Sequence, residues 1–220
     1  MKLVGAPEFF EAIARRYDRA YALGGEQTRA RMAPVLSALP APPAKVLDLG
    51  VGTGRELGAL QDAGYSPVGL DVSPTMLELC ARRARPVPLV QADLWVPLPF
   101  EDASFDAAIS LHGTLAHPPA REAYAPLARE LARVLRPGGV FVAEVPSAEW
   151  LAHAADDGSE GRLVPIAPGR TVHEDQVAGV AIEIIALTPG EWAAAFEPDF
   201  DVTCHPLDER ETRVIARRRA

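Results

Sequence analysis

The sequence of 220 residues suits one globular domain with a small appendage. Hydrophobic residues make up 48% of the chain and charged residues 24%, which is an ordinary balance for a protein that buries a core. The net charge of -8 argues against a large nucleic-acid-binding face and against binding to anionic membranes. No stretch approaches the ~20 apolar residues of a membrane helix, and the first residues show no signal-peptide pattern. We therefore expect a cytoplasmic protein with neither a nucleic-acid nor a membrane partner.

The two cysteines, Cys80 and Cys204, lie far apart in the sequence. Their separation fits neither the spacing of metal ligands nor a disulfide framework. We expect free thiols and no metal site, and the chain to be a monomer or a homodimer.

Two helices are predicted in residues 1–43, and we interpret this segment as an N-terminal helical cap. Phe9, Ile13 and Tyr17 recur four residues apart, which is the spacing of one helix face. A second stripe follows, and the sequence PAPP at 40–43 ends it because proline breaks a helix. The second stripe consists of Met32, Val35, Leu36 and Leu39.

Strand and helix patterns alternate from Lys45 onwards, which predicts an α/β fold with a doubly wound, mostly parallel sheet. Such sheets bind ligands at the carboxyl ends of their strands. The predicted strands lie at 45–50, 66–72, 88–94, 105–112 and 139–146, and the predicted helices at 54–64, 73–84 and 121–139.

The second half is less regular. Residues 150–175 are polar and rich in Gly and Asp, and we expect a loop there that covers a substrate pocket. The apolar, β-branched run at 177–187 predicts a strand, and Thr188 is the expected N-cap of a short helix. Residues 200–207 and 212–218 predict a closing antiparallel hairpin. We assign 44–220 to one binding domain, with 150–187 as an acceptor-site insertion.

The strongest motif is VLDLGVGTGRE at 46–56, where glycines 50, 52 and 54 follow a buried strand and open a helix. Glycine allows a tight turn and a close approach of ligand to backbone, and the helix start offers unpaired N–H groups. The dinucleotide fingerprint requires a third glycine one residue later, where Arg55 stands, so the spacing disfavours a pyrophosphate cofactor. A tight turn without a ligand is the alternative for this motif alone.

Two acids at predicted strand ends strengthen the ligand interpretation. Asp71 ends the second strand, where its carboxylate can accept both hydroxyls of a ribose. Asp93 ends the third, where it can accept a hydrogen bond from an adenine amino group while Val72 and Leu94 sandwich the ring. Either acid could instead be a solvated loop residue, although Ser73 already supplies the helix cap beside Asp71.

Residues 46–142 resemble the class I S-adenosylmethionine (SAM)-dependent methyltransferases, especially the small-molecule group that includes the quinone-biosynthesis enzymes. The matching segments are DLGVGTG, GLDVSPTML, QADLWVPLPFEDASFDAAIS and ELARVLRPGGVFV, in the family's order and spacing. The resemblance implies a Rossmann-like sheet of seven strands with one antiparallel strand. It also implies S-adenosyl-L-methionine as cofactor.

The resemblance assigns cofactor-binding roles to eleven residues. Around the methionine part of SAM it places Asp48, Gly50, Val51, Gly52 and Ser110, with Asp48 orienting the glycine loop. Asp71 would hold the ribose, and the adenine would lie among Val72, Met76, Asp93 and Leu94. An aromatic residue of the first helix would close over the cofactor, with Tyr17 the candidate and Tyr21 the alternative.

His112 and His117 follow the fourth predicted strand and are the candidate catalytic residues. Histidine is suited to removing a proton near neutral pH, which a phenol, alcohol or ammonium acceptor requires. The alternative is that either histidine packs in its loop without a chemical role. No third residue has convincing metal-ligand spacing.

We expect the enzyme to transfer a methyl group to a small molecule, at oxygen or nitrogen. A methyltransferase of RNA or protein is the first alternative. The second is a regulatory SAM-binding protein without activity. A nucleotide-dependent reductase is disfavoured by the glycine spacing.

Overall fold

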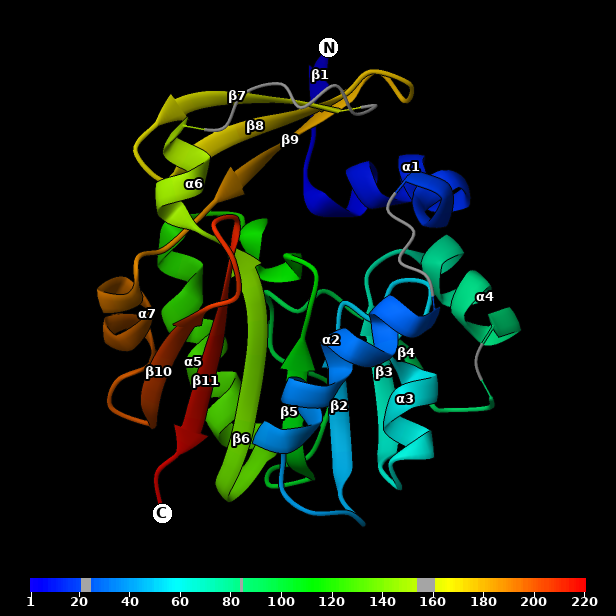
Figure 1. The fold of residues 1–220 in the computed structure, drawn as a ribbon, viewed down its shortest axis with the longest axis vertical. Coiled ribbons are helices and arrows are strands. Elements are labelled where there is room, and N and C mark those ends of the chain that lie inside the picture. Colours follow the sequence, from blue (N-terminus) through cyan, green and yellow to red (C-terminus); the bar gives the residue numbers. More distant parts are fainter. Residues whose placement is uncertain (21–24, 84, 154–160) are drawn as a thin grey trace.

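The computed structural model describes residues 1–20, 25–83, 85–153 and 161–220, and these form two sheets (Figure 1). Within these ranges the larger sheet has seven strands in the order β10-β11-β6-β5-β2-β3-β4. The smaller has four, in the order β1-β9-β8-β7.

The larger sheet confirms the predicted fold class. Its neighbours from β6 to β4 are parallel, and β11 runs antiparallel to both β6 and β10. The closing hairpin is therefore present as predicted. The strands are β2 (Lys45–Leu49), β3 (Ser66–Asp71), β4 (Leu89–Gln91), β5 (Phe105–Ser110), β6 (Leu135–Pro146), β10 (Phe200–Pro206) and β11 (Glu211–Arg218).

Helices cover both faces of this sheet because its central strands are apolar on both sides. On one face, Met32 of α2, Leu57 of α3 and Cys80 of α4 pack with Val46. Leu47 lies in the core of the opposite face, with α5 and α7. The helices are α2 (Gly25–Ala38), α3 (Leu57–Asp62), α4 (Pro74–Arg83), α5 (Tyr124–Val134) and α7 (Pro189–Phe196).

The helix predicted at 121–139 is shorter in the structure. Two 3₁₀ turns, η1 (Thr114–Ala116) and η2 (Arg121–Ala123), precede α5, and Leu135 already begins β6. The caps are as predicted: Ser73 accepts the N–H of Met76, and Thr188 forms a capping box at the start of α7.

The smaller sheet lies beyond the carboxyl ends of the large sheet's parallel strands, at the top of Figure 1. The polar segment that we predicted as a loop forms two of its strands, which the helix α6 (Ala148–His153) precedes. The prediction failed because many side chains there are only partly buried, so the strands lack a regular alternation. The strands are β1 (Lys2–Leu3), β7 (Gly161–Ala167), β8 (Arg170–Asp175) and β9 (Val180–Ile185).

The helix α1 (Ala6–Ala20) lies under the small sheet and beside α4 (Figure 1). Phe9 and Ile13 are 1% exposed and pack against Ile182 of β9, which confirms the first predicted helix stripe. The Glu11 carboxylate accepts hydrogen bonds from Ser73 and Thr75 at the start of α4. These contacts hold α1 over the carboxyl end of the large sheet.

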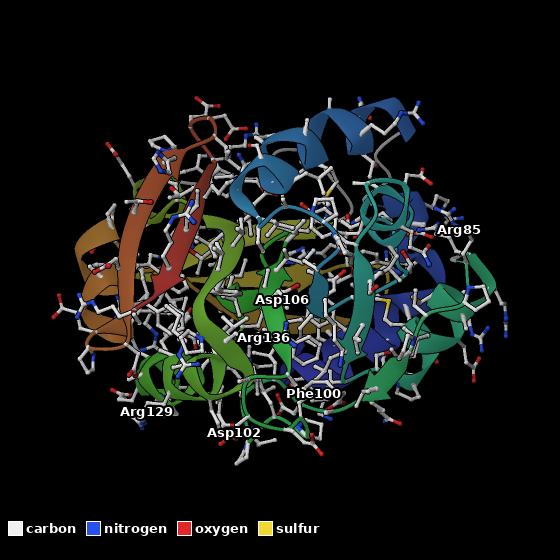
Figure 2. The ribbon with its side chains drawn as sticks, turned by 90° about the horizontal axis from the view of Figure 1, so that it is seen from below. Arg85, Phe100, Asp102, Asp106, Arg129 and Arg136 are labelled. Carbon is white, nitrogen blue, oxygen red and sulfur yellow. The ribbon has the colours of Figure 1, made fainter. Side chains whose placement is uncertain are left out.

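The opposite end of the molecule carries ion pairs, and Figure 2 shows it from below with Asp106 and Arg136 close together. Arg133 likewise pairs with Asp102, at 2.9 Å. Across the described ranges, no helix is both long and apolar enough to cross a membrane.

Candidate active site: two adjoining cavities

The first cavity, of about 440 Å³, lies at the carboxyl ends of β2, β3 and β4. Residues 3–7 at the start of the chain and the helix α1 also line it. It brings together nine of the residues predicted from the sequence, namely Tyr17, Gly50, Gly52, Asp71, Val72, Met76, Asp93, Leu94 and His117.

The glycine turn after β2 needs glycine for two different reasons. Gly50 and Gly52 have φ of 77° and 52°, a region that residues with a Cβ rarely adopt. A Cβ at Gly50 would lie 2.3 Å from Cγ2 of Thr114. A Cβ at Gly52 would meet nothing closer than the Gly50 carbonyl oxygen, at 3.9 Å. Gly50 therefore permits close packing inside the protein, whereas Gly52 leaves room on the cavity side.

Asp71 ties this turn to the end of β3. One carboxylate oxygen accepts the N–H of Gly52 at 2.8 Å, and the other accepts the N–H of Ser73 at 2.9 Å. A carboxylate offers about four lone-pair sites, so two remain for hydroxyl groups of a ligand. Burial raises the pKa of Asp71, and the two backbone N–H groups act in the opposite direction.

Asp93 lies at the far end of the cavity, beyond β4. Its Oδ1 accepts the N–H of Trp95 at 2.9 Å, which leaves Oδ2 available for an exocyclic amino group. Trp95 also lines the cavity, and its ring packs edge-on against Tyr124. The sequence analysis quoted Trp95 within a matching segment but gave it no role, because the resemblance assigned roles there only to Asp93 and Leu94.

Three of the predicted cofactor residues lie behind the cavity wall. Asp48, Val51 and Ser110 are each at most 3% exposed, and they are not among the lining residues. The Ser110 hydroxyl donates to the Leu49 carbonyl and so joins β5 to β2. Burial raises the pKa of Asp48, whose Oδ2 has no hydrogen-bond partner within the described structure.

A second cavity, of about 460 Å³, adjoins the first. Phe10, Tyr17 and His117 line both cavities and so form their boundary. The second cavity has apolar walls from α1 and β9, and its ionisable groups are Tyr17, Arg31, Arg55, His112, His117, His173 and Glu211. Tyr21, the alternative to Tyr17, lies outside the described residues.

His112 lines the second cavity and contacts a carboxylate. Its Nε2 lies 2.5 Å from Oε1 of Glu56, whose side chain is 7% exposed. Burial acts to raise the pKa of Glu56, but the hydrogen bond and charge of His112, with Arg55, bring it below its ordinary value. The ionised carboxylate only accepts hydrogen bonds, so Nε2 carries a proton.

His117 sits in a different environment. Its Nδ1 lies 3.0 Å from the carbonyl oxygen of Glu183 and donates to it, so Nε2 holds the lone pair of the neutral ring. Burial lowers the pKa of His117 to about 4. The ring is therefore neutral at pH 7 and is a weak base.

Glu144, a further acid near the carboxyl ends of the central strands, has both carboxylate oxygens engaged by arginines. Its carboxylate is fully buried on β6 and accepts from Arg31 at 2.5 Å and from Arg213 at 2.7 Å. Arg31 also pairs with Glu211 at 2.6 Å. This network holds α2 against the sheet.

The fold is α/β, with a glycine turn after the first central strand, one acid at the end of β3 and another just beyond β4, and these are the features that the sequence analysis associates with SAM-dependent proteins. The cavity fits SAM: Gly52 leaves space, Asp71 keeps two acceptor sites and the buried Asp48 has an unpaired oxygen behind the turn. Residues 46–139 match the family described as "Methyltransferase domain". The chain therefore contains a class I SAM-dependent methyltransferase domain, whose cofactor is SAM.

Known proteins with this domain act on different acceptors. The chain is 40% identical over 132 residues to a demethylmenaquinone methyltransferase of Corynebacterium kroppenstedtii, covering 59% of this chain and 55% of the relative. It is 33% identical over 114 residues to an 18S rRNA (guanine-N(7))-methyltransferase of Bos taurus, covering 50% and 41%. The chain thus spans about half the length of these curated relatives.

The architecture as a whole also has a solved counterpart. The crystal structure of the PH0226 protein from Pyrococcus horikoshii OT3 superposes with a TM-score of 0.76 and 21% identity. The match covers 96% of this chain and 99% of that one, so the small sheet and α1 fall within the shared fold.

Proposed function

We propose that the protein transfers a methyl group from SAM to a small molecule, at oxygen or nitrogen. The observation that carries this proposal is the boundary of Phe10, Tyr17 and His117 between two cavities. A cofactor in the first cavity and an acceptor in the second would meet at these side chains. Such alignment of reactants contributes much of the rate when the leaving group is already good.

Each cofactor residue has a role in this proposal. Asp71 holds the ribose hydroxyls, Asp93 accepts the adenine amino group, and Val72, Met76 and Leu94 contact the ring. Gly50 and Gly52 shape the turn on which the methionine part lies, and Tyr17 closes over it. Asp48, Val51 and Ser110 support the turn from behind.

His112 is the proposed general base, and His117 is the second candidate. The contact with a buried, ionised carboxylate favours a proton-accepting role for His112. The low pKa of His117 favours a neutral hydrogen-bond acceptor instead.

A second candidate function is methylation of RNA, which the rRNA methyltransferase among the relatives favours. The net charge of -8 and the restricted size of the second cavity favour the small molecule. A regulatory protein that binds SAM without transferring its methyl group is the third outcome.

One assay separates these functions. The protein is first titrated with SAM and with NADH by calorimetry, where we expect micromolar affinity for SAM, about -8 kcal/mol, and no heat with NADH. It is then incubated with methyl-labelled SAM and a panel of phenols, amines, acids, thiols and ribosomal RNA. Label on a phenol, amine or acid supports the proposal, and label only on a thiol or on RNA overturns it. Tight SAM binding without label on any acceptor indicates the regulatory protein.

A further inference from the structure

Glu56 follows the glycine turn proposed to bind the cofactor, but its side chain does not cap the helix that begins there. It occupies the N-cap position of α3, and its side chain makes no capping hydrogen bond there. The carboxylate instead contacts His112, which is 56 positions further along the chain. A buried carboxylate that does not cap a helix needs a partner, and here the imidazole is that partner.

The backbone at His112 brings the imidazole to this contact. His112 has φ of 55° and the next residue, Gly113, has φ of 76°, so two successive residues are left-handed. The Gly113 N–H donates to the Glu144 carbonyl on β6 at 3.0 Å, which anchors the turn. A left-handed non-glycine residue is uncommon and is often found where a side chain must be held in one direction.

We propose that Glu56 is a positioning residue for methyl transfer, which accepts the Nε2–H of His112 and leaves the Nδ1 lone pair to remove the acceptor's proton. This inference rests on the proposed function. Within the described structure, Nδ1 of His112 has no hydrogen-bond partner, and the ring lines the second cavity. The ionised Glu56 carboxylate then stabilises the imidazolium that forms.

The proton and electron pairs balance in this step. The proton of an acceptor hydroxyl moves to Nδ1 while the oxygen's electron pair forms the bond to the methyl carbon. SAM, when bound, supplies that methyl group, and its sulfur keeps the pair of the broken bond. The imidazolium afterwards releases its proton to water. Glu56 remains ionised throughout, as the carboxylate of a catalytic triad does.

The first test uses NMR of the imidazole nitrogens and requires no acceptor. The signals of His112 are assigned by their absence from the spectrum of His112→Gln. We expect the Nε2–H tautomer in the unmodified protein, and in Glu56→Gln a larger share of the Nδ1–H tautomer, because the charged acceptor of the Nε2–H is lost. The other ionisable groups that line the same cavity are Tyr17, Arg31, Arg55, His117, His173 and Glu211.

Glu211→Gln is the matched control for this experiment, because it removes one negative charge from the same cavity without a hydrogen bond to His112. Its effect on the His112 signals should be much smaller than that of Glu56→Gln. Thermal unfolding shows whether each variant folds, and Glu56→Asp, which keeps the charge, replaces Glu56→Gln if the latter does not. The Asp variant should then retain most of the Nε2–H tautomer. An Nδ1–H tautomer in the unmodified protein, or His112 signals that Glu56→Gln changes no more than Glu211→Gln does, overturns the inference.

The second test uses whichever acceptor takes the label. Glu56→Gln should lower kcat about 10- to 100-fold at neutral pH with the affinity for SAM unchanged, less than the 10²–10⁴-fold typical for loss of a general base. Added to His112→Gln, it should cause no further loss, because the two residues act as one unit. Independent, multiplying losses overturn the inference. Absence of transfer to every acceptor overturns the proposed function instead, and the NMR experiment still tests the role of Glu56.

Discussion

Asp71 and Gly52 are joined by a hydrogen bond of 2.8 Å from the glycine N–H to Oδ2 of the carboxylate. The residue proposed to hold the ribose therefore also fixes the turn proposed to hold the methionine part of the cofactor. A ligand that occupies both ends of the cavity meets two groups that are already oriented, which reduces the entropy cost of binding.

Asp71→Asn should lower the affinity for SAM by about 2–4 kcal/mol, because an amide nitrogen cannot accept from the backbone or from a hydroxyl. Calorimetry with SAM and with its demethylated product measures the loss. Asp62→Asn is the control, since Asp62 is exposed on α3 and pairs with Arg85 outside both cavities. An Asp71 variant that binds as tightly as this control would show that the carboxylate does not hold the ribose.

Gly50→Ala should mainly lower the stability of the protein, whereas Gly52→Ala should mainly lower its affinity for SAM. Gly50→Ala should lower the free energy of unfolding by roughly 2–4 kcal/mol, from left-handed strain and the clash with Thr114. Gly52→Ala should cost about 1–2 kcal/mol of stability from strain alone but weaken SAM binding strongly, because its Cβ enters the cavity. Chemical denaturation and calorimetry measure the two effects.

A second substitution tests why Gly50→Ala is expected to lower the stability. Thr114→Ala removes the two side-chain atoms nearest to the Cβ expected at Gly50, so Gly50→Ala combined with Thr114→Ala should regain part of the lost stability. If the double variant is less stable than Gly50→Ala alone, packing against Thr114 is not the reason for the glycine.

The large sheet was predictable because its signals are local. The strands β2, β3 and β5 are short, largely buried apolar runs, and Ser73 and Thr188 mark helix starts by their own hydrogen bonds. The small sheet was not predictable in the same way. β1 has two exposed residues and exists as a strand through its pairing with β9, 177 or more positions away in the sequence.

In the candidate site, too, the residues placed by local sequence patterns were predictable and the long-range contacts were not. Asp71 and Asp93 could be found because their place at strand ends follows from the strand pattern. The partner of His112 could not, because it depends on a left-handed backbone at His112 and on where the glycine turn places Glu56. The ion pairs of Glu144 could not be predicted for a related reason, because its two arginine partners come from α2 and β11.

Acid should destabilise the protein in part through His117. Its pKa falls from an ordinary value of 6.5 to about 4 in the folded state because of burial, so the unfolded chain binds the proton more tightly. The folded state therefore has its full stability from this group above pH 6.5, loses it progressively as the pH falls, and has lost about 3 kcal/mol below pH 4. Denaturant unfolding of the unmodified protein and of His117→Gln at several pH values measures this term. As the pH falls, the free energy of unfolding of the unmodified protein should decrease relative to that of His117→Gln. A difference that stays constant with pH would contradict the assignment.

His112→Gln should lower the rate of methyl transfer by about 10²–10⁴-fold at neutral pH, the usual contribution of a general base, while the affinity for SAM stays nearly the same. The loss should shrink at high pH, where a phenol or ammonium acceptor ionises without help. His117→Gln is the parallel variant: since its ring is a weak base, its effect should be smaller and should fall mainly on the alignment of the acceptor. Rates measured against pH for both variants decide between the two histidines.

If His117→Gln shows the larger loss together with the recovery at high pH, His117 is the base and His112 only shapes its turn. If both variants keep near-full activity, neither histidine removes a proton. With Glu144 held between two arginines, the enzyme would then act by alignment alone on an acceptor that is already anionic.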